Sequence, residues 1–473
     1  MALHAAVTLV RESEIPLTSQ IQRFIKKEVT EGILHPGTRL PSSRRLADDL
    51  GVSRSVVVEA YGQLVAEGYL EAVQGAGTQV VRHLDPAAAP PVASLLDDGH
   101  AGGRDGRDPA VRWDLRPGGG NVPAFPRREW LAAYQRALNT ADPSALDYPP
   151  LAGDPRLRLE LARYLGRMCG VRSTPGQVMV TAGFAQALGL LTAVLPQLGI
   201  TALAIENPGH PGQRRFVHES GLRPVPLPVD GEGLDVGALA ASGARAVLVT
   251  PAHQFPTGAT LSARRREALV RWAHEADGLI IEDDYDRGLW YERGTGRPLA
   301  LQRLAPDHVV YAGTASKSMA PGLRLGWLAA PVALLDRLQR VRARQDLGTD
   351  VLTQLAFAEF LRGGAYDRHL RRLGALCRAR HDALREAVHR HLPGAAVTGR
   401  AAGLHAYVTL PRHTDEAALV AGALRRSVLL SGAAAHHARP GEGAPALVVG
   451  HAHLPRSGAQ QAVRELAAVL RGT

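Results

Sequence analysis

The sequence predicts an α/β protein in two parts: a small N-terminal domain of helices and one β-hairpin, then a larger domain of alternating strands and helices. The chain has 473 residues, more than one hydrophobic core normally holds. Residues 83–112 are rich in Ala, Pro, Gly and Asp without apolar periodicity, which predicts a flexible linker. Beyond it, residues 113–473 alternate short apolar runs with helical patterns, which is typical of a mostly parallel sheet covered by helices on both faces.

The N-terminal part, residues 12–82, carries the start and stop signals of three helices. Ser42 is the expected N-cap of the second helix, which Gly51 is expected to end. Ser53 is the expected N-cap of the third helix, which Gly68 is expected to end. Two glycines between short β-prone runs indicate a hairpin after the third helix. The expected elements are helices at 17–31, 43–50 and 54–67 and a hairpin at 69–81.

The larger part contains five candidate strands separated by helical stretches. These candidates are Val178–Thr181, Ala202–Glu206, Ala246–Thr250, Leu279–Asp283 and Val309–Ala312. A smaller α/β piece at about 365–473 contains a further strand at 403–410. The most apolar stretch, 182–205, is interrupted by Gln and Pro residues, so it is predicted to be a buried helix followed by a strand and not a membrane span.

Bulk properties set limits on function. The net charge of +10 is compatible with a polyanionic partner, but residues 11–82 hold as many acidic as basic residues, so charge alone is weak support for DNA binding. The N-terminus lacks the pattern of a secretory signal. Cys169 and Cys377 have no metal-binding or redox spacing, so no metal site is expected and both thiols are expected to be buried in a reducing cytoplasm.

The segment from Leu40 to Tyr61 has the pattern of a helix, a tight turn and a second helix. Such a turn brings the N-terminus of the second helix to a DNA major groove. Hydroxyl and cationic side chains stand at the starts of both helices, where they can reach bases and phosphates, and small residues at the hairpin tip allow close approach. The residues predicted to contact double-stranded DNA are Ser42, Arg44, Arg45, Ser53, Arg54, Ser55, Gly75, Gly77 and Thr78.

Lysine usage singles out one residue of the larger part. The chain has three lysines, Lys26, Lys27 and Lys317, while arginine carries nearly all other positive charge. A guanidinium can replace an ammonium on a surface but cannot form a Schiff base, so Lys317 is a candidate for amine chemistry. It lies in Gly-Thr-Ala-Ser-Lys-Ser-Met-Ala-Pro-Gly-Leu-Arg after a candidate strand, where Ser316 and Arg324 can bind a phosphate.

A carboxylate at the end of another strand complements this lysine. Asp283 can pair with a pyridine N–H, with Asp284 as the competing candidate, and Tyr285 can hydrogen-bond a ring hydroxyl. An amine for an aldehyde, a carboxylate for a pyridine nitrogen and donors for a phosphate are what pyridoxal 5′-phosphate (PLP) needs from a protein. The sequence therefore predicts PLP as a cofactor, bound as a Schiff base to Lys317.

Three further motifs follow candidate strands and can complete this site. Backbone amides where the helix begins after Val180-Thr-Ala suit a phosphate, although many strand–helix junctions look alike. Imidazole or amide side chains in Pro-Ala-His-Gln-Phe-Pro-Thr-Gly and Glu-Asn-Pro-Gly-His can contact or cover the ring. The candidates are Gly183, Phe184 and Ala185 for the phosphate, and His210, His253 or Gln254 for the ring.

Two family resemblances rest on these motifs. The N-terminal part resembles the GntR-type winged helix-turn-helix through Leu-Pro-Ser-Ser-Arg, Leu-Gly-Val-Ser-Arg, Ala-Tyr-Gly-Gln-Leu and Ala-Glu-Gly-Tyr-Leu. The later motifs, in this order, resemble fold-type I aminotransferases, and the fusion resembles the MocR subfamily of regulators. The resemblance implies a winged helix-turn-helix joined to PLP-dependent transferase-like large and small domains. It also implies a homodimer, a small-molecule effector, an operator as partner and a place in the cytoplasm with the nucleoid.

Three positions depart from the family pattern. Ala76 stands where the wing often has Ser, and His210 stands where the family often has Tyr. Val448 stands where many relatives have the Arg that binds a substrate α-carboxylate. Losing a buried ion-pair partner costs about 2–5 kcal/mol of binding. Transamination of ordinary amino acids is therefore expected to be impaired, unless Arg214 or Arg439 has taken the role.

The sequence leaves several functions to be compared. The first is a PLP-dependent transcriptional regulator that senses PLP itself, as in vitamin B6 homeostasis, or an amino compound through Schiff-base chemistry. The second is an active aminotransferase with a DNA-binding appendage, against which Val448 argues. The third is a regulator whose large domain is only a dimerisation scaffold, against which the intact motif around Lys317 argues.

Overall fold

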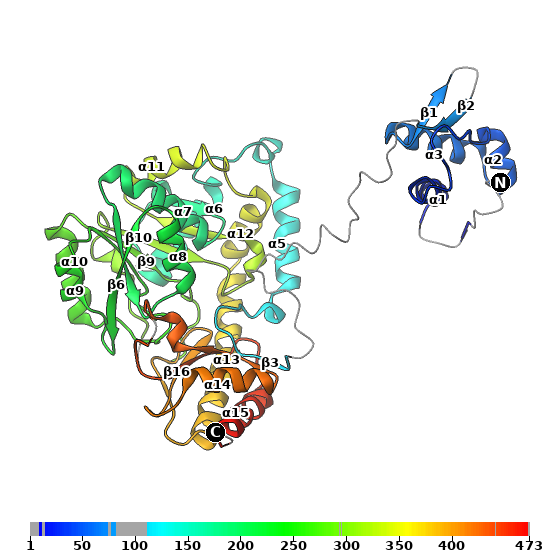
Figure 1. The fold of residues 1–473 in the computed structure, drawn as a ribbon. Coiled ribbons are helices and arrows are strands. Elements are labelled where there is room, and N and C mark those ends of the chain that lie inside the picture. Colours follow the sequence, from blue (N-terminus) through cyan, green and yellow to red (C-terminus); the bar gives the residue numbers. More distant parts are fainter. Residues whose placement is uncertain are drawn as a thin grey trace. The chain divides into compact units, whose positions relative to one another are not determined.

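The computed structural model describes residues 9–11, 15–73, 77–81, 111–292, 294, 296–439 and 441–471. The chain divides into two compact units, one within residues 1–105 and one within residues 106–473 (Figure 1). Most of the expected linker, residues 83–110, lies outside the described residues.

The first unit has the predicted three helices and hairpin. The elements are α1 (Leu17–Thr30), α2 (Ser43–Leu50), α3 (Arg54–Ala66), β1 (Leu70–Val73) and β2 (Gly77–Val80). β1 and β2 pair in antiparallel register, with Leu70 opposite Val80. Ile25, Leu46 and Leu64, one from each helix, are fully buried in one apolar cluster that also contains Leu70 and Val80. This core fixes α3 against α2 and leaves the starts of both helices exposed.

The two expected N-caps differ in the structure. The hydroxyl of Ser42 accepts a hydrogen bond from the backbone N–H of Arg45 at 3.3 Å, as a capping side chain does. Ser53 also stands at an N-cap position, but its hydroxyl bonds the hydroxyl of Ser55 at 2.8 Å and caps no backbone N–H. Gly51 ends α2 with a φ of 62°, a conformation that favours glycine.

The second unit is built around an eight-stranded sheet in the order β4-β11-β10-β9-β8-β5-β6-β7. The central neighbours from β10 to β6 are parallel, while β11 and β7 pair in antiparallel register. The strands are β4 (Val178–Thr181), β5 (Ala202–Asn207), β6 (Arg223–Asp230), β7 (Gly233–Leu234), β8 (Ala246–Val249), β9 (Leu279–Asp283), β10 (Val309–Thr314) and β11 (Gly326–Ala329). All five candidate strands of the large domain are therefore confirmed.

Helices cover both faces of this sheet (Figure 1). In β9, Ile281 packs in a cluster with Leu191 of α7, whereas Ile280 packs in another with Leu269 of α10. Successive strand residues point to opposite faces, so a central strand buried on both sides needs apolar residues at every position. The helices are α5 (Arg127–Thr140), α6 (Pro155–Cys169), α7 (Phe184–Val194), α8 (Pro211–Glu219), α9 (Val236–Ala241), α10 (Ala263–Glu275), α11 (Val332–Arg342) and α12 (Val351–Arg362).

The strands β6 and β11 of the large sheet were not predicted, for different reasons. β6 has a proline at every second position from Pro224 to Pro228, a pattern that argues against a strand. These prolines are tolerated because β7 pairs only with Val229 and Asp230, so most of β6 has β5 as its sole neighbour. β11 is only four residues long and is defined by its pairing with β10 and β4.

The small subdomain has its own four-stranded sheet and apolar core. The order is β12 (Ala396–Thr398), β13 (His405–Thr409), β16 (Ala446–Gly450) and β15 (Ser431–Gly432). It packs against α13 (Ala365–His391), α14 (Glu416–Arg425) and α15 (Arg456–Arg471). The short segment around β3 (Trp113–Asp114) also belongs here, because β3 pairs with β14 (Val428–Leu429).

Two expectations about composition are also met in the described part. Cys169 and Cys377 are buried and free, and burial raises the pKa of each thiol to about 11. Among the helices of the described residues, we find none with the length and apolar character to cross a bilayer. The apolar stretch 182–205 forms α7 and most of β5.

We expect Ser42→Ala to lower the local stability of α2 by about 1 kcal/mol, because it removes the capping hydrogen bond. Hydrogen exchange of the full chain, read on peptides from 43–50, should then show faster exchange. Ser53→Ala is the matched control, since that hydroxyl caps no backbone N–H and α3 should keep its protection. Equal loss of protection in the two variants would contradict this account.

Candidate functional site

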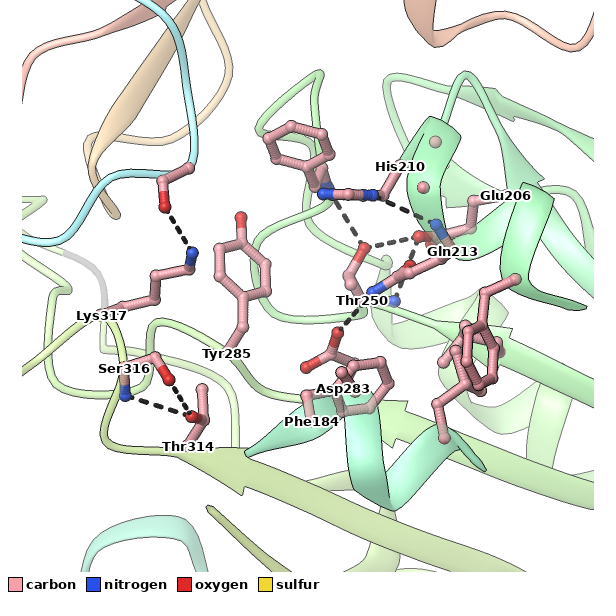
Figure 2. A pocket seen from close by; sticks show the side chains of 18 of the residues that line it. Phe184, Glu206, His210, Gln213, Thr250, Asp283, Tyr285, Thr314, Ser316 and Lys317 are labelled. Carbon is pink, nitrogen blue, oxygen red and sulfur yellow. Dashed lines mark hydrogen bonds between the residues drawn. The ribbon is translucent and has the colours of Figure 1, made fainter. Parts of the chain in front are cut away.

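A cavity of about 350 Å³ opens at the carboxyl ends of the parallel strands β5, β8, β9 and β10. Ligands of open α/β sheets bind at this edge, and the volume suits a small cofactor. The residues that line it include Gly118, Phe184, Ala185, Glu206, His210, Gln213, Arg214, Phe255, Asp283, Tyr285, Ser316, Lys317, Arg324 and His405. In the view of Figure 2, Lys317 and Ser316 lie on one side of Tyr285, and Asp283, Gln213 and His210 lie on the other.

Lys317 lies in the loop between β10 and β11 and lines the cavity. Its Nζ donates a hydrogen bond to the backbone oxygen of Gly118 at 2.6 Å. The segment around Gly118 passes close to this loop, and a Cβ at Gly120 would come within 2.8 Å of the Ser316 oxygen. The segment after β3 can thus lie close to the loop that carries Lys317, because Gly120 has no side chain to clash with that loop.

Asp283 ends β9 and is buried with one oxygen satisfied and the other free. Its Oδ2 accepts a hydrogen bond from Gln213 Nε2 at 3.2 Å, while Oδ1 has no partner among the described residues. Burial raises the pKa of Asp283 to about 8. A buried acceptor without a donor is costly, so the site suits a ligand that brings the donor which none of the described residues supplies.

The competing carboxylate, Asp284, does not line the cavity. Its oxygens are held by the guanidinium groups of Arg287 and Arg297 and by the hydroxyl of Tyr311, which donates at 2.8 Å. The alternation of side chains at the end of a strand explains this separation, because neighbouring residues point to opposite sides. Asp283 is therefore the carboxylate that faces the cavity.

The other end of the cavity presents donors suited to an anion. Gly183, with a φ of 89°, precedes α7, and the first helical residues Phe184 and Ala185 line the cavity. An atom added at Gly183 would lie 3.5 Å from the Arg324 guanidinium, which has no hydrogen bond or ion pair with any described residue. Ser316 joins this group, and its Oγ lies 2.9 Å from Thr314 Oγ1. Helix amides, hydroxyls and a free guanidinium form a phosphate-type site.

His210, Tyr285 and Phe255 form an aromatic part of the wall. The ring of His210 lies 5.5 Å from that of Phe255, and its Nδ1 accepts a hydrogen bond from the Gln213 N–H at 3.3 Å. Burial lowers the pKa of His210, so its ring is neutral at pH 7. The hydroxyl of Tyr285 donates to the backbone oxygen of His253 at 3.2 Å.

His253 and Gln254, which we expected to touch the ring, are not among the residues that line the cavity. His253 Nδ1 lies 2.6 Å from Asp286 Oδ2, and both side chains are buried. Gln254 donates to the backbone oxygen of Pro208 at 2.9 Å. Both side chains are turned into the protein by these partners, and Phe255 takes the place at the wall.

Several wall residues were missed by sequence reasoning. Glu206 lines the cavity, and burial raises its pKa to about 7 although Thr250 and Gln254 donate to its Oε2. Its position at the end of a predicted strand was a usable signal. His405, from β13 of the small subdomain, carries no such signal because only the packing of the two subdomains brings it to the cavity.

Arg214 and Arg439 are the two candidates to replace the carboxylate-binding arginine that is missing at Val448. Val448 is fully buried in β16, opposite Tyr407 of β13, and does not line the cavity. Arg214 does line it, but its guanidinium donates to the backbone oxygens of His436 at 3.3 Å and His437 at 2.8 Å. Arg439 is not at the wall.

In the first unit, the predicted DNA-contacting side chains gather at the starts of α2 and α3. All of the hydroxyl and guanidinium side chains predicted there are exposed: Ser42, Arg44, Arg45, Ser53, Arg54 and Ser55. Arg54 Nε donates to Ser43 Oγ at 3.4 Å, which links the two helix starts. Gly77 and Thr78 begin β2, with Gly77 exposed, while Gly75 lies outside the described residues.

Comparisons with known proteins agree with this architecture. Residues 17–80 match the bacterial regulatory proteins of the gntR family, and residues 118–440 match the aminotransferase class I and II family. The chain is 36% identical over 400 residues to the HTH-type pyridoxine biosynthesis transcriptional regulator PdxR of Corynebacterium glutamicum, covering 84% of each chain. It is 33% identical over 400 residues to the probable rhizopine catabolism regulatory protein MocR of Rhizobium meliloti, covering 82% of this chain and 80% of that one.

Among solved structures, α-aminoadipate aminotransferase LysN of Thermus thermophilus, complexed with N-(5′-phosphopyridoxyl)-L-leucine, is similar with a TM-score of 0.68 and 27% identity. The match covers 81% of this chain and 95% of that one. The N-terminal part and the larger part of the chain each match a known family, in the order that the motifs predicted. The chain belongs to the MocR-type branch of the GntR transcriptional regulators, in which a winged helix-turn-helix is joined to an aminotransferase class I and II domain.

Proposed function

We propose that this regulator binds operator DNA through its winged helix-turn-helix and uses PLP, held in the cavity around Lys317 and Asp283, as its signal. The observation that carries the proposal is the balance of charges in the cavity. The cavity offers partners for the aldehyde, the pyridine nitrogen, the phosphate and the ring hydroxyl of PLP. Its described wall leaves no uncommitted cation for the carboxylate of an amino acid. The regulator PdxR of C. glutamicum, named for pyridoxine biosynthesis, supports the same signal.

The residues of the cavity fit PLP at three points. The unpartnered Oδ1 of Asp283 can accept a hydrogen bond from the pyridine nitrogen. The free guanidinium of Arg324 and the amides at the start of α7 can bind the phosphate, with Ser316 beside them. Lys317 supplies the only amine of the wall. When bound, PLP contributes an aldehyde that condenses reversibly with amines and an electron-poor ring.

The chain's own residues would then orient the ring. Tyr285 can hydrogen-bond a ring hydroxyl, and His210 can lie over the ring with a neutral imidazole. His253 acts through Tyr285 in this proposal. It contacts both Asp286 and the Tyr285 hydroxyl, so it can hold the tyrosine in place. Gln213 keeps one oxygen of Asp283 fixed, so that the other oxygen faces the cavity.

The cations of the wall explain why PLP itself is the preferred signal. The described wall has three, Arg214, Lys317 and Arg324. Arg324 would be used by the phosphate and Lys317 by the aldehyde, and Arg214 already donates to two backbone oxygens. An α-carboxylate entering the cavity would have to break the Arg214 bonds, which are partly buried and charge-assisted.

Two other ligand roles remain as alternatives with different support. An amino compound without a carboxylate could react with PLP in the cavity without needing a cation, and would be sensed through the same Lys317. Active transamination is favoured by the similarity to LysN and by the presence of both Lys317 and Asp283 at the wall of one cavity. It is opposed by Val448, which gives a substrate carboxylate no partner.

The family also bears on partners. We propose that the protein is a homodimer that binds two half-sites, separated by one or more helical turns of DNA. Its work on bacterial DNA would take place in the cytoplasm, at the nucleoid.

We expect Lys317→Ala to abolish the visible absorbance band of the protein-bound cofactor, since no other wall residue carries a primary amine. Far-ultraviolet circular dichroism should remain that of the folded protein. Lys27→Ala, on α1 in the other unit with a side chain 66% exposed, is the matched control and should keep the band. An unchanged spectrum in Lys317→Ala would refute the assignment.

We expect the free energy of unfolding of the cofactor-free protein to fall as pH rises from 5 to 8. The fall should be steeper than in the Asp283→Asn variant. The folded state holds the Asp283 proton up to a pKa of about 8, whereas the unfolded chain loses it near pH 4. The contribution of this group to stability is therefore complete below about pH 4 and is lost as pH rises toward 8.

Thermal unfolding at several pH values measures this difference. Glu206 and Glu282, whose pKa values burial raises to about 7, are present in both proteins, so the difference isolates Asp283. Parallel stability curves for the two proteins would contradict a buried, protonated Asp283.

We expect PLP alone to change the affinity of the full chain for its own upstream DNA. Fluorescence anisotropy would compare protein without PLP, with PLP, and with PLP plus a panel of amines. An effect of PLP alone supports the proposed signal, and an effect only with an amine replaces it by amine sensing. Arg54→Ala should weaken binding by about 1–3 kcal/mol in every condition. Arg23→Ala, exposed on α1, is the control.

A further inference from the structure

A second cavity, of about 550 Å³, lies in the aminotransferase-like unit away from the residues that line the first. It is bounded by the end of α6, the chain that follows β9 and one face of α13. None of its lining residues belongs to the cofactor cavity. Those that matter for its chemistry are Arg167, Arg287, Trp290, Arg297, Asp367, Arg371, Gly374 and Arg378.

Three of its five arginines already have carboxylate partners. Arg167 pairs with Asp367 at 2.8 Å. Arg287 and Arg297 both contact Asp284, and Arg297 also lies 3.2 Å from Asp286. These three guanidinium groups are therefore balanced by three carboxylates.

The remaining two arginines carry an uncompensated charge. Arg371, which is exposed, and Arg378, which is half-buried, have neither an ion pair nor a side-chain hydrogen bond with any described residue. Among the described residues, the buried Nε of Arg378 has no partner, and neither has the Nε of Arg297, whose side chain is only 8% exposed. Buried donors of this kind are rarely left unused. The cavity thus has two positive charges more than its own acids neutralise.

Both of these arginines lie on the face of α13 that lines the cavity. Arg371 and Arg378 are seven residues apart on α13, hence on the same face and about 10 Å apart along the axis. Gly374 lies between them, and a Cβ there would meet nothing within 4 Å, so the space above it is open. Trp290 lies at the wall, with the Arg297 guanidinium 5.9 Å from its ring.

We propose that this second cavity binds a small phosphate monoester that carries a flat ring. A phosphate monoester has a charge of about −1.5 to −2 at pH 7, which matches the two unpaired guanidinium groups. Arginine binds phosphate oxygens with paired, parallel hydrogen bonds, and the indole of Trp290 offers an apolar surface to a ring. This site is separate from the proposed PLP site and does not depend on it.

Isothermal titration calorimetry on the full chain saturated with PLP tests the proposal, because the first phosphate site is then filled. The probes are phenyl phosphate, inorganic phosphate and phenol. We expect phenyl phosphate to bind more tightly than inorganic phosphate and phenol not to bind. The double variant Arg371→Gln/Arg378→Gln should weaken phenyl phosphate binding at least about tenfold, through loss of charge-assisted hydrogen bonds.

Two further variants separate a built cavity from a generally basic surface. Gly374→Leu keeps both arginines but fills the open space, so it should also weaken phenyl phosphate binding about tenfold. Arg372→Gln changes an exposed neighbour that pairs with Glu129 outside the cavity and should leave binding unchanged. The proposal is overturned if Arg372→Gln weakens binding as much as the double variant, or if Gly374→Leu has no effect. It is also overturned if the double variant weakens only DNA binding, since the two arginines would then contact nucleic acid.

Discussion

A row of buried carboxylates at the end of β9 is the constraint on which the rest of the site depends. Glu282, Asp283, Asp284 and Asp286 are each at most 4% exposed. Buried carboxylates are tolerated only when each is neutralised, paired or hydrogen-bonded. Glu282 accepts two backbone N–H groups, and Asp284 and Asp286 share Arg297. Of the oxygens of these four acids, only the cavity-facing one of Asp283 has no donor among the described residues, which makes it the place for a ligand.

The partners of these acids come from distant parts of the chain and organise the surroundings. Asp286 holds His253, which in turn contacts the Tyr285 hydroxyl, so a residue outside the cavity positions one inside it. Arg287 and Arg297 tie the chain after β9 to Asp284 and form a wall of the second cavity. The buried charges that follow β9 thus contribute to the walls of two cavities. Among the described residues, the first cavity has an acceptor without a donor at Asp283, and the second has a donor without an acceptor at Arg378.

The charge balance of the first cavity also bears on how an aminotransferase-like domain can act in a regulator. A transaminase must bind a substrate carboxylate as well as its cofactor, whereas a sensor of the cofactor needs only the cofactor contacts. Here Val448 is fully buried in β16, between Tyr407 of β13 and Ser431 of β15, and Arg214 donates to two backbone oxygens. The fold is that of the enzymes, but the wall favours a ligand without a carboxylate.

The sequence by itself determined the two-part architecture and the five main strands, because periodicity and caps are local signals. It also singled out Lys317 and Asp283, which both line the first cavity, as candidates for the site. Only the tertiary structure decided what non-local contacts control. It turned His253 and Gln254 away from the wall and brought His405 and Gly118 to it. It gave Ser42 but not Ser53 a capping bond. It also left Arg371 and Arg378 unpaired around Gly374, because a charge is balanced by neighbours in space that a linear sequence does not identify.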